Sequence, residues 1–191
     1  LVTNESCKEI ATTRGGVPRE RCFVVRNCPG LNDFPLRATN HELKRGKAYL
    51  IVYVGVMGSQ DGIDLLLETA SHVTKTKGRG DVLFVLIGDG AEASKMRARA
   101  LERDRVKCGQ FTGALYGDDL KAYLAAADIG VAPDPSNVFN GKLTIIKTLE
   151  YMASGLPIVL FDWPEGRSRA GDAALYARPD NPNDFVDKII Q

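Results

Sequence analysis

The stretch APDPSNVFNGKLTIIKTLEYMASGLPIVLFD, residues 132–162, has the pattern of a strand end, an irregular loop, a helix, a tight turn and a second strand. Two prolines, two asparagines, an aspartate and a glycine between Pro133 and Gly141 predict irregular structure there. A helix is expected over about Leu143–Ser154, and the apolar run Ile158–Phe161 is typical of a buried parallel strand. Open α/β sheets bind ligands at such a strand-to-helix loop, and the helix N-terminus attracts phosphate.

From residue 48 the chain alternates between apolar, β-branched runs and stretches of helical pattern. This spacing predicts parallel pairing with right-handed crossovers, and therefore an α/β fold with a doubly wound, Rossmann-like parallel sheet. The predicted strands are residues 48–54, 82–87, 107–112, 129–132, 158–161 and 173–176, and the predicted helices are 61–75, 91–103, 118–127, 143–154, a short segment at 165–170 and 183 onward.

Residues 1–47 precede this alternation. We expect a helix over Asn4–Arg14, capped by Thr3 or Asn4 and stopped by glycines, and then a short strand over Arg21–Arg26. Residues 27–46 contain prolines, glycines and mixed charges, so an irregular linker or wrapping segment is expected there.

Length and composition are those of an ordinary globular protein of 191 residues, 44% hydrophobic and 26% charged. The formal net charge of +1 gives no reason to expect a nucleic-acid partner. The four cysteines have no CxxC spacing and are predicted to be reduced thiols, as in a cytoplasmic protein. The longest apolar stretch, residues 48–57, is far shorter than a membrane span, and no signal-like leader opens the chain.

Glycines follow several predicted strands, at Gly55, Gly58, Gly88, Gly90 and Gly113. Glycine lets the backbone approach a ligand closely, but it also makes tight turns between strand and helix. For one loop the turn is the simpler explanation, whereas glycines in several loops at the same edge of the sheet favour a ligand site.

The run that begins Gly88-Asp89-Gly90 fits the dinucleotide pattern G-x-G-x-x-A. It follows the second predicted strand, however, and residues 108–113, where a ribose-binding carboxylate is expected, contain no acid. An NAD-dependent oxidoreductase is therefore a weak alternative.

The helix after Gly141 places Thr144, Lys147, Glu150 and Tyr151 on one face by their spacing. Thr144 and the amides after it could hold a phosphate, Lys147 could neutralise its charge, and Glu150 could accept hydrogen bonds from sugar hydroxyls. The alternative is a surface ion pair between Lys147 and Glu150 without a ligand.

Several other chemistries have no support in the residues. His41 and His72 are isolated, so neither a zinc cluster nor a nucleophilic triad is expected. The chain has no Asp-x-Asp pair that would hold a metal–diphosphate, and no metal site is predicted.

The runs YVGVMGSQDGIDLLLETA, VLIGDGAE, FTGAL, VAPDPSN, KTLEYMASGLPIVLFD and AGDAALY follow one another between residues 53 and 176. Together they resemble the C-terminal domain of family-four retaining glycosyltransferases of the GT-B fold, over about residues 48–190. The resemblance implies that residues 48–191 are a donor domain, truncated at its C-terminus, and that residues 1–47 are the end of an N-terminal domain and its linker. It implies a cytoplasmic enzyme of polysaccharide biosynthesis, with peripheral attachment to the inner membrane face as an option.

In this family the C-terminal domain holds a nucleotide-diphosphate sugar, and a glycan or lipid-linked acceptor binds the N-terminal domain, most of which the resemblance implies is outside these residues. The resemblance implies a UDP-, GDP- or ADP-sugar as substrate, no cofactor and no required metal. Glu150 would bind the ribose, the Ile146 and Lys147 amides would hold the diphosphate, and the loop from Gly113 would line the base. The full predicted donor set is Gly58, Gly88, Asp89, Gly90, Gly113, Ala114, Leu115, Asp134, Lys142, Thr144, Ile145, Ile146, Lys147 and Glu150.

Two positions depart from the family pattern. Many members carry two glutamates separated by seven residues; Glu150 is the second, and Lys142 occupies the position of the first, so no catalytic residue is assigned. Residues 56–60 contain neither the arginine nor the lysine that often clamps the diphosphate, and Lys142 and Lys147 are candidates to replace them. Two further alternatives are a sugar-nucleotide epimerase and a non-catalytic nucleotide-binding module, and the isolated chain is expected to turn over poorly.

Overall fold

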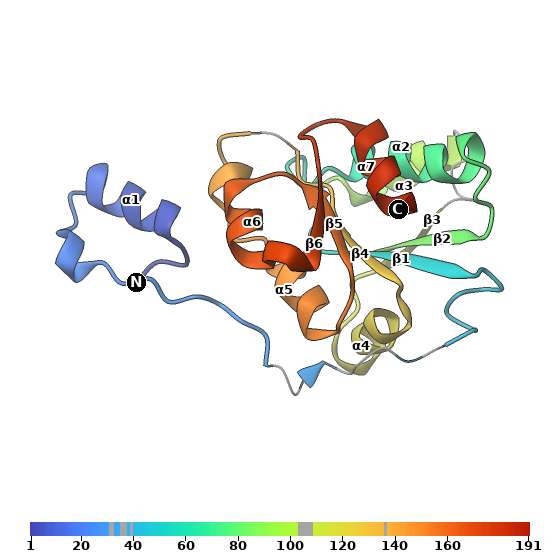
Figure 1. Ribbon diagram of the computed structural model, residues 1–191, viewed down its shortest axis with the longest axis horizontal. Coiled ribbons are helices and arrows are strands. Elements are labelled where there is room, and N and C mark those ends of the chain that lie inside the picture. The colour runs from blue at the N-terminus through green and yellow to red at the C-terminus, as the bar shows by residue number, and fades with distance from the viewer. Residues whose placement is uncertain (31–32, 35–37, 39, 103–108, 136) are drawn as a thin grey trace.

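A computed structural model of the chain describes residues 1–30, 33–34, 38, 40–102, 109–135 and 137–191. Its centre is a six-stranded, fully parallel sheet in the order β3-β2-β1-β4-β5-β6 (Figure 1). This order reverses between β1 and β4, so the predicted doubly wound α/β fold is confirmed. The strands are β1 (Tyr49–Val54), β2 (Val82–Ile87), β3 (Gly109–Gly113), β4 (Ile129–Ala132), β5 (Ile158–Phe161) and β6 (Ala174–Ala177).

Helices cover both faces of this sheet (Figure 1). One buried cluster joins the sheet to α2 (Ile63–Ser71), its π-helical extension η3 (His72–Thr76), α3 (Ala93–Glu102) and α7 (Pro182–Ile190). The second cluster joins the opposite face to α4 (Gly117–Ala126) and α5 (Ile146–Ala153). Shorter helices complete the domain: η5 (Asn140–Lys142), α6 (Pro164–Ala170) and η6 (Gly171–Ala173).

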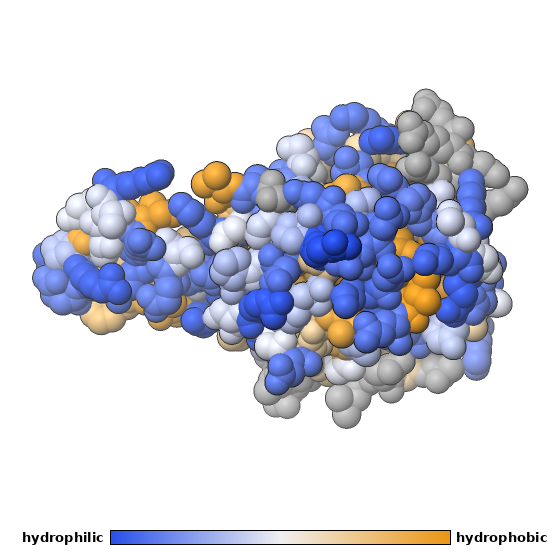
Figure 2. All heavy atoms as spheres, turned by 45° about the horizontal axis from the view of Figure 1, so that its top comes forward, coloured by the Kyte–Doolittle hydropathy of each residue, from blue (hydrophilic) through white to orange (hydrophobic). Residues whose placement is uncertain are grey.

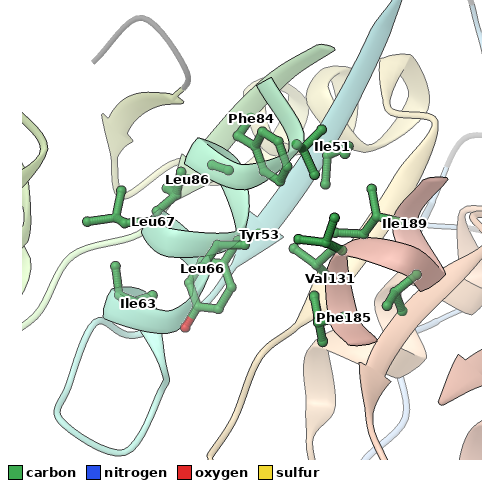
Figure 3. Packing of buried hydrophobic residues seen from close by; sticks show 14 of the residues in the cluster. Ile51, Tyr53, Ile63, Leu66, Leu67, Phe84, Leu86, Val131, Phe185 and Ile189 are labelled. Carbon is green, nitrogen blue, oxygen red and sulfur yellow. The ribbon is translucent and has the colours of Figure 1, made fainter. Parts of the chain in front are cut away.

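The alternation of side chains along β1 explains the two clusters. Ile51 and Tyr53 point into the first cluster, which also contains Leu66 of α2 and Phe185 of α7 (Figure 3). Successive strand residues point to opposite faces, so Leu50 and Val52 fall in the second cluster. A strand buried on both faces needs the nearly continuous apolar run that the sequence has here.

The predicted elements agree with the structure except at a few ends and in one strand. Residues 21–26 do not form the predicted strand: η1 (Arg19–Arg21) is a 3₁₀ turn, and Val24 makes only an isolated bridge to Val2. Phe23 and Val25 remain 60% and 53% exposed, because no sheet formed by the described residues covers this segment. Residues 107–108 of the third predicted strand lie outside the described part of the chain.

The leading segment, residues 1–47, makes few contacts with the α/β domain that follows it. Helix α1 (Glu5–Thr13) has no buried residue of its own, and it stands apart from the sheet in Figure 1 and projects from the body in Figure 2. Its N-cap residue Asn4, by contrast, is fully buried. Further along, Lys44 pairs with Asp128 at 2.7 Å and holds the end of the linker at the amino end of β4.

No helix in the described part of the chain is both long enough and apolar enough to cross a membrane.

Candidate functional site

The first βα loops pack directly on one another at the carboxyl edge of the sheet. Gly55 N donates to Ile87 O at 3.0 Å, and Gly88 N donates to Gly113 O at 2.8 Å. Gly88 has φ +142°, and a Cβ built there would lie 1.8 Å from Gly55 O. At Gly90 a Cβ would lie 2.7 Å from Met57 O. Contact between loops therefore accounts for both glycines, and their contact with a ligand stays a prediction.

The strand order reverses between β1 and β4, and these two strands separate after a short pairing. Only Ile51 and Val52 pair with Ile129 and Gly130. Beyond this point the hydroxyl of Tyr151 fills the opening: it accepts from Val54 N at 2.9 Å and donates toward the carbonyl of Val131 at 3.2 Å. An open α/β sheet places its ligand crevice at such a reversal.

A pocket of about 340 Å³ lies at this reversal. It brings together six of the predicted site residues, from the loop after β4, the approach to α5 and α5 itself: Asp134, Thr144, Ile145, Ile146, Lys147 and Glu150. Its other lining residues come from the end of β1, its loop and the loop before α5, and they are not members of the predicted donor set: Val54, Gly55, Val56, Asp61, Asn140 and Leu143.

The remaining predicted residues do not line this pocket. They are Gly58, Gly88, Asp89, Gly90, Gly113, Ala114, Leu115 and Lys142. Gly58 borders a separate polar pocket of about 160 Å³ beside α3. Lys142 is the last residue of η5, and its carbonyl oxygen accepts a hydrogen bond from Asn4 Nδ2 at 2.8 Å.

Lys147 is the cation of the pocket, and its partner is Asp134. The Lys147 Nζ lies 3.0 Å from Asp134 Oδ1, and the two side chains are only 10% and 9% exposed. Nζ also lies 4.8 Å from the centre of the Tyr53 ring, within the range of a cation–π interaction. The surface pair between Lys147 and Glu150 that the spacing suggested is therefore not the ion pair that forms.

Two other carboxyls, both half-buried, line the pocket. Burial is the main cause that raises the pKa of Asp61, opposed by the Gly58 N–H and by Lys147 and reinforced by the charge of Asp134. Burial also raises the pKa of Glu150, while Lys147 lowers it. Asp134 Oδ2 is buried and has no hydrogen-bond partner among the described residues. The pocket therefore concentrates negative charge around one lysine.

Side-chain clamps hold the long loop after β4 against the first loop. Asn140 Nδ2 donates to Gln60 O at 2.8 Å and to Pro135 O at 2.9 Å, and Trp163 Nε1 donates to Asp134 O at 3.1 Å. At Gly62, which has φ +68°, a Cβ would lie 2.0 Å from Pro133 O. This close approach requires glycine and fixes the loop that carries Asp134.

Helix α5 begins at Ile146, three residues later than predicted, because Leu143 and Ile145 have extended backbone conformations. In the described part of the chain no side chain caps this helix, and the Thr148 hydroxyl donates backwards to Ile145 O at 2.7 Å. The first amides of α5 are thus available to an anion at the pocket.

Tyr151 does not share the site face that its spacing predicted. Its side chain is fully buried against the sheet, and its ring occupies the space that a Cβ at Gly130 would need. Burial raises its pKa strongly, so the phenol stays neutral. Among the described residues no cluster of three or more histidine, cysteine or acidic side chains has the arrangement of a metal site.

Known proteins provide an independent comparison. Residues 48–191 match the family model described as "Glycosyl transferases group 1". The GDP-mannose-dependent alpha-mannosyltransferase of Corynebacterium glutamicum is 28% identical over 114 residues, which cover 60% of this chain and 23% of that protein.

Two solved structures share the fold. A mutant of S. aureus TarM, in a complex with Fondaparinux, alpha-GlcNAc-glycerol and UDP, superposes with a TM-score of 0.75 at 20% identity, over 100% of this chain and 36% of the TarM chain. The C-terminal domain of a glycosyl transferase group 1 family protein from Francisella tularensis gives a TM-score of 0.66 at 17% identity, over 85% of this chain and 86% of that domain. The chain thus spans about a third of TarM but 86% of the isolated C-terminal domain. Because the family match extends over residues 48–191, the chain belongs to the glycosyl transferases group 1 family.

Proposed function

We propose that the chain binds the nucleotide-diphosphate-sugar donor of a retaining glycosyltransferase, in the pocket between β1 and β4. The observation that carries the proposal is the convergence there of the uncapped α5 N-terminus, the Lys147 cation and the Glu150 carboxylate. Family membership supports it, as do the UDP bound to TarM and the GDP-mannose dependence of the mannosyltransferase.

In this proposal the diphosphate lies at the start of α5. The Ile146 and Lys147 amides donate to phosphate oxygens, and the positive end of the helix dipole stabilises the negative charge. Lys147 supplies a full cation, which residues 56–60 do not. Its ion pair with Asp134 holds the ammonium group in the pocket before the ligand arrives.

Glu150, one helical turn after Lys147, is proposed to accept hydrogen bonds from the ribose hydroxyls. A carboxylate offers acceptors to both hydroxyls of a diol, and such charge-assisted bonds are strong. The base would then extend over the stacked loops at Gly88–Gly90 and Gly113–Leu115, which share the carboxyl edge of the sheet with the pocket.

The reaction requires a second domain in this proposal. A glycan or lipid-linked acceptor would bind that domain, and the sugar would be transferred with retention of configuration in the cleft, without a required metal or a nucleic-acid partner. The setting would be polysaccharide biosynthesis in the cytoplasm, with peripheral attachment to the inner membrane face as an option. The isolated chain should turn over poorly, because the reacting geometry needs both walls of the cleft.

Calorimetric titration of the chain with UDP, GDP, ADP and NAD tests the proposal. Saturable binding of one nucleoside diphosphate, abolished or strongly weakened by Lys147→Met, is the expected result. The matched control is Lys77→Met, which removes an exposed cation paired with Asp187. Binding of NAD alone would contradict the proposal and favour an oxidoreductase. The family match favours neither an oxidoreductase nor an epimerase.

A non-catalytic nucleotide-binding module is the second candidate, and Lys142 motivates it. The family pattern places a carboxylate at that position, whereas this chain has a lysine. The two candidates differ in turnover: a full-length enzyme that binds the nucleotide but transfers no sugar from any matching donor would favour the binding module.

A further inference from the structure

The hydroxyl of Thr144, on the wall of the pocket, receives two hydrogen bonds from outside it. Asn4 Nδ2 donates to Thr144 Oγ1 at 3.0 Å, and Arg169 Nη2 donates to the same oxygen at 2.9 Å. A hydroxyl has two acceptor lone pairs and one O–H donor. Both lone pairs are therefore occupied, and neither the amide nitrogen nor the guanidinium can accept the Thr144 proton.

The orientation of the Asn4 side chain is fixed by its other bonds. Its Oδ1 accepts from Cys7 N at 2.7 Å and so caps α1, which leaves the nitrogen on the side of Thr144. The second N–H of this amide donates to Lys142 O at 2.8 Å. Asn4 is fully buried, so all three of its bonds are protected from water. Its amide cannot flip without the loss of the helix cap.

Arg169 adds positive charge behind the same hydroxyl. Burial is the largest cause that lowers its pKa, followed by the charge of Arg26, yet a guanidinium stays protonated at neutral pH. Its Nε is buried without a hydrogen-bond partner among the described residues, whereas Nη2 also donates to Thr3 O at 3.5 Å and the charge of Glu165 raises the pKa of the group. Hydrogen bonds in a chain polarise one another, and a cationic donor to Oγ1 makes the Thr144 O–H a stronger donor.

We propose that Thr144 is a pre-oriented hydrogen-bond donor to a phosphate oxygen of the nucleotide, and that Asn4 and Arg169 are its positioning residues. This inference rests on the proposed nucleotide site and adds a contact that the leading segment, about 140 residues earlier in the chain, controls. Phosphate oxygens only accept hydrogen bonds, so a hydroxyl whose proton can point only away from its two donors matches them. The stretch Asn4–Cys7 thereby becomes part of the site.

Four variants of the chain test this inference by calorimetry. Thr144→Val removes the hydroxyl at nearly constant shape, and Thr144→Ser retains it. Asn4→Asp keeps the oxygen that caps α1 but replaces the amide donor with an acceptor, which draws the Thr144 proton away from the pocket. The fourth variant combines Thr144→Val with Asn4→Asp. Each is titrated with the nucleoside diphosphate that the unaltered chain binds best and with the corresponding nucleoside, and thermal unfolding checks that each is folded.

Thr144→Val and Asn4→Asp should each weaken diphosphate binding about tenfold or more, with nucleoside binding unchanged and Thr144→Ser close to the unaltered chain. The double variant should bind no worse than Thr144→Val, because Asn4 acts through the hydroxyl. A further loss in the double variant would instead mean that the new charge repels phosphate directly, and would overturn the role of Asn4. Unaltered diphosphate affinity in Thr144→Val would overturn this inference alone, whereas an unaltered chain that binds no nucleoside diphosphate would overturn the proposed function as well.

Discussion

Lys147 and Asp134 form an ion pair of 3.0 Å at the pocket, with about nine-tenths of each side chain buried. The pair connects α5 to the loop after β4, across the reversal of strand order. It holds the ammonium group in place, and the Asp134 carboxylate also offsets part of the positive charge that the lysine can offer to a phosphate. Stability and ligand affinity are therefore both tied to this contact.

Removal of one member of the pair should destabilise the fold. Lys147→Met leaves the Asp134 carboxylate buried and unpaired, which costs on the order of 3 kcal/mol of the free energy of unfolding. Asp134→Leu in the same chain removes the stranded charge and should restore part of that loss. Urea unfolding of the two single variants and the double variant measures this coupling. Independent, additive losses would show that the pair contributes nothing beyond its separate side chains.

Glu150 should increase the affinity for nucleotides that carry both ribose hydroxyls over the affinity for nucleotides that lack them. Glu150→Ala should weaken binding of the nucleoside diphosphate about 10- to 100-fold, because it loses charge-assisted hydrogen bonds, and Glu150→Gln should lose less. The same variants should bind a 2′,3′-dideoxynucleoside diphosphate as the unaltered chain does. An equal loss with both ligands in calorimetry would assign Glu150 to the phosphates or to the fold instead of to the ribose.

Asp61 should make stability and affinity depend on pH. Its pKa is raised above the ordinary 3.8, chiefly by burial, so folding favours the protonated carboxyl. That contribution is fully present below the unfolded-state pKa and is lost as the pH rises through the folded-state value. Asp61→Asn removes it, so the stability of the variant relative to the unaltered chain should increase as the pH rises above the ordinary 3.8 and level off above the raised pKa of Asp61.

The ligand responds to Asp61 in the same direction. A neutral Asp61 repels a diphosphate less, and affinity should increase as the pH falls through the raised pKa, an increase that Asp61→Asn should abolish. The difference between the two chains isolates the effect of Asp61 from the effects of Asp81, Asp162 and Asp184. The pKa values of these three carboxyls are lowered, so their contributions to stability change with pH in the opposite direction. A difference that does not change with pH would contradict the role of Asp61.

Gly88 should be required by the fold independently of any ligand. Gly88→Ala places a Cβ 1.8 Å from Gly55 O in a backbone conformation that side chains rarely adopt, so the two loops must separate. We expect a loss of several kcal/mol in the free energy of unfolding. Gly80→Ala is the matched control, because a Cβ at Gly80 meets nothing within 4 Å. Equal unfolding midpoints for the two variants would contradict this account.

Local patterns were sufficient to predict most of the sheet. β2, β4 and β5 occupy the residues that their apolar runs indicate, since a strand buried on both faces must be apolar throughout. The exposed Phe23 and Val25 look the same in sequence as buried strand residues, and only the absence of a neighbouring strand distinguishes them. Family resemblance identified the glycosyltransferase class, which the family match confirms.

Contacts between distant segments are what the sequence did not reveal. Asp134 as the partner of Lys147, and Asn4 as the partner of Thr144, depend on which loops meet at the carboxyl edge of the sheet. Asp61 was within reach of the sequence analysis, because it follows the first strand and the ligand crevice of such a sheet lies beside that strand. Helical spacing alone predicted that Tyr151 lies beside Lys147, whereas in the structure its ring packs against the sheet next to Gly130.

Tyr151→Phe tests whether the Tyr151 hydroxyl contributes to stability without contributing to nucleotide binding. Its hydroxyl bonds to Val54 N and Val131 O where β1 and β4 part, and the variant leaves both groups unpaired. A buried group without its partner costs about 1–3 kcal/mol, so the free energy of unfolding should fall by that amount in urea. Tyr116→Phe, at an 80% exposed position, should leave it unchanged. Nucleoside diphosphate affinity of folded Tyr151→Phe should stay within about twofold, because the phenol does not line the pocket; a selective loss of affinity at unchanged stability would return Tyr151 to the site.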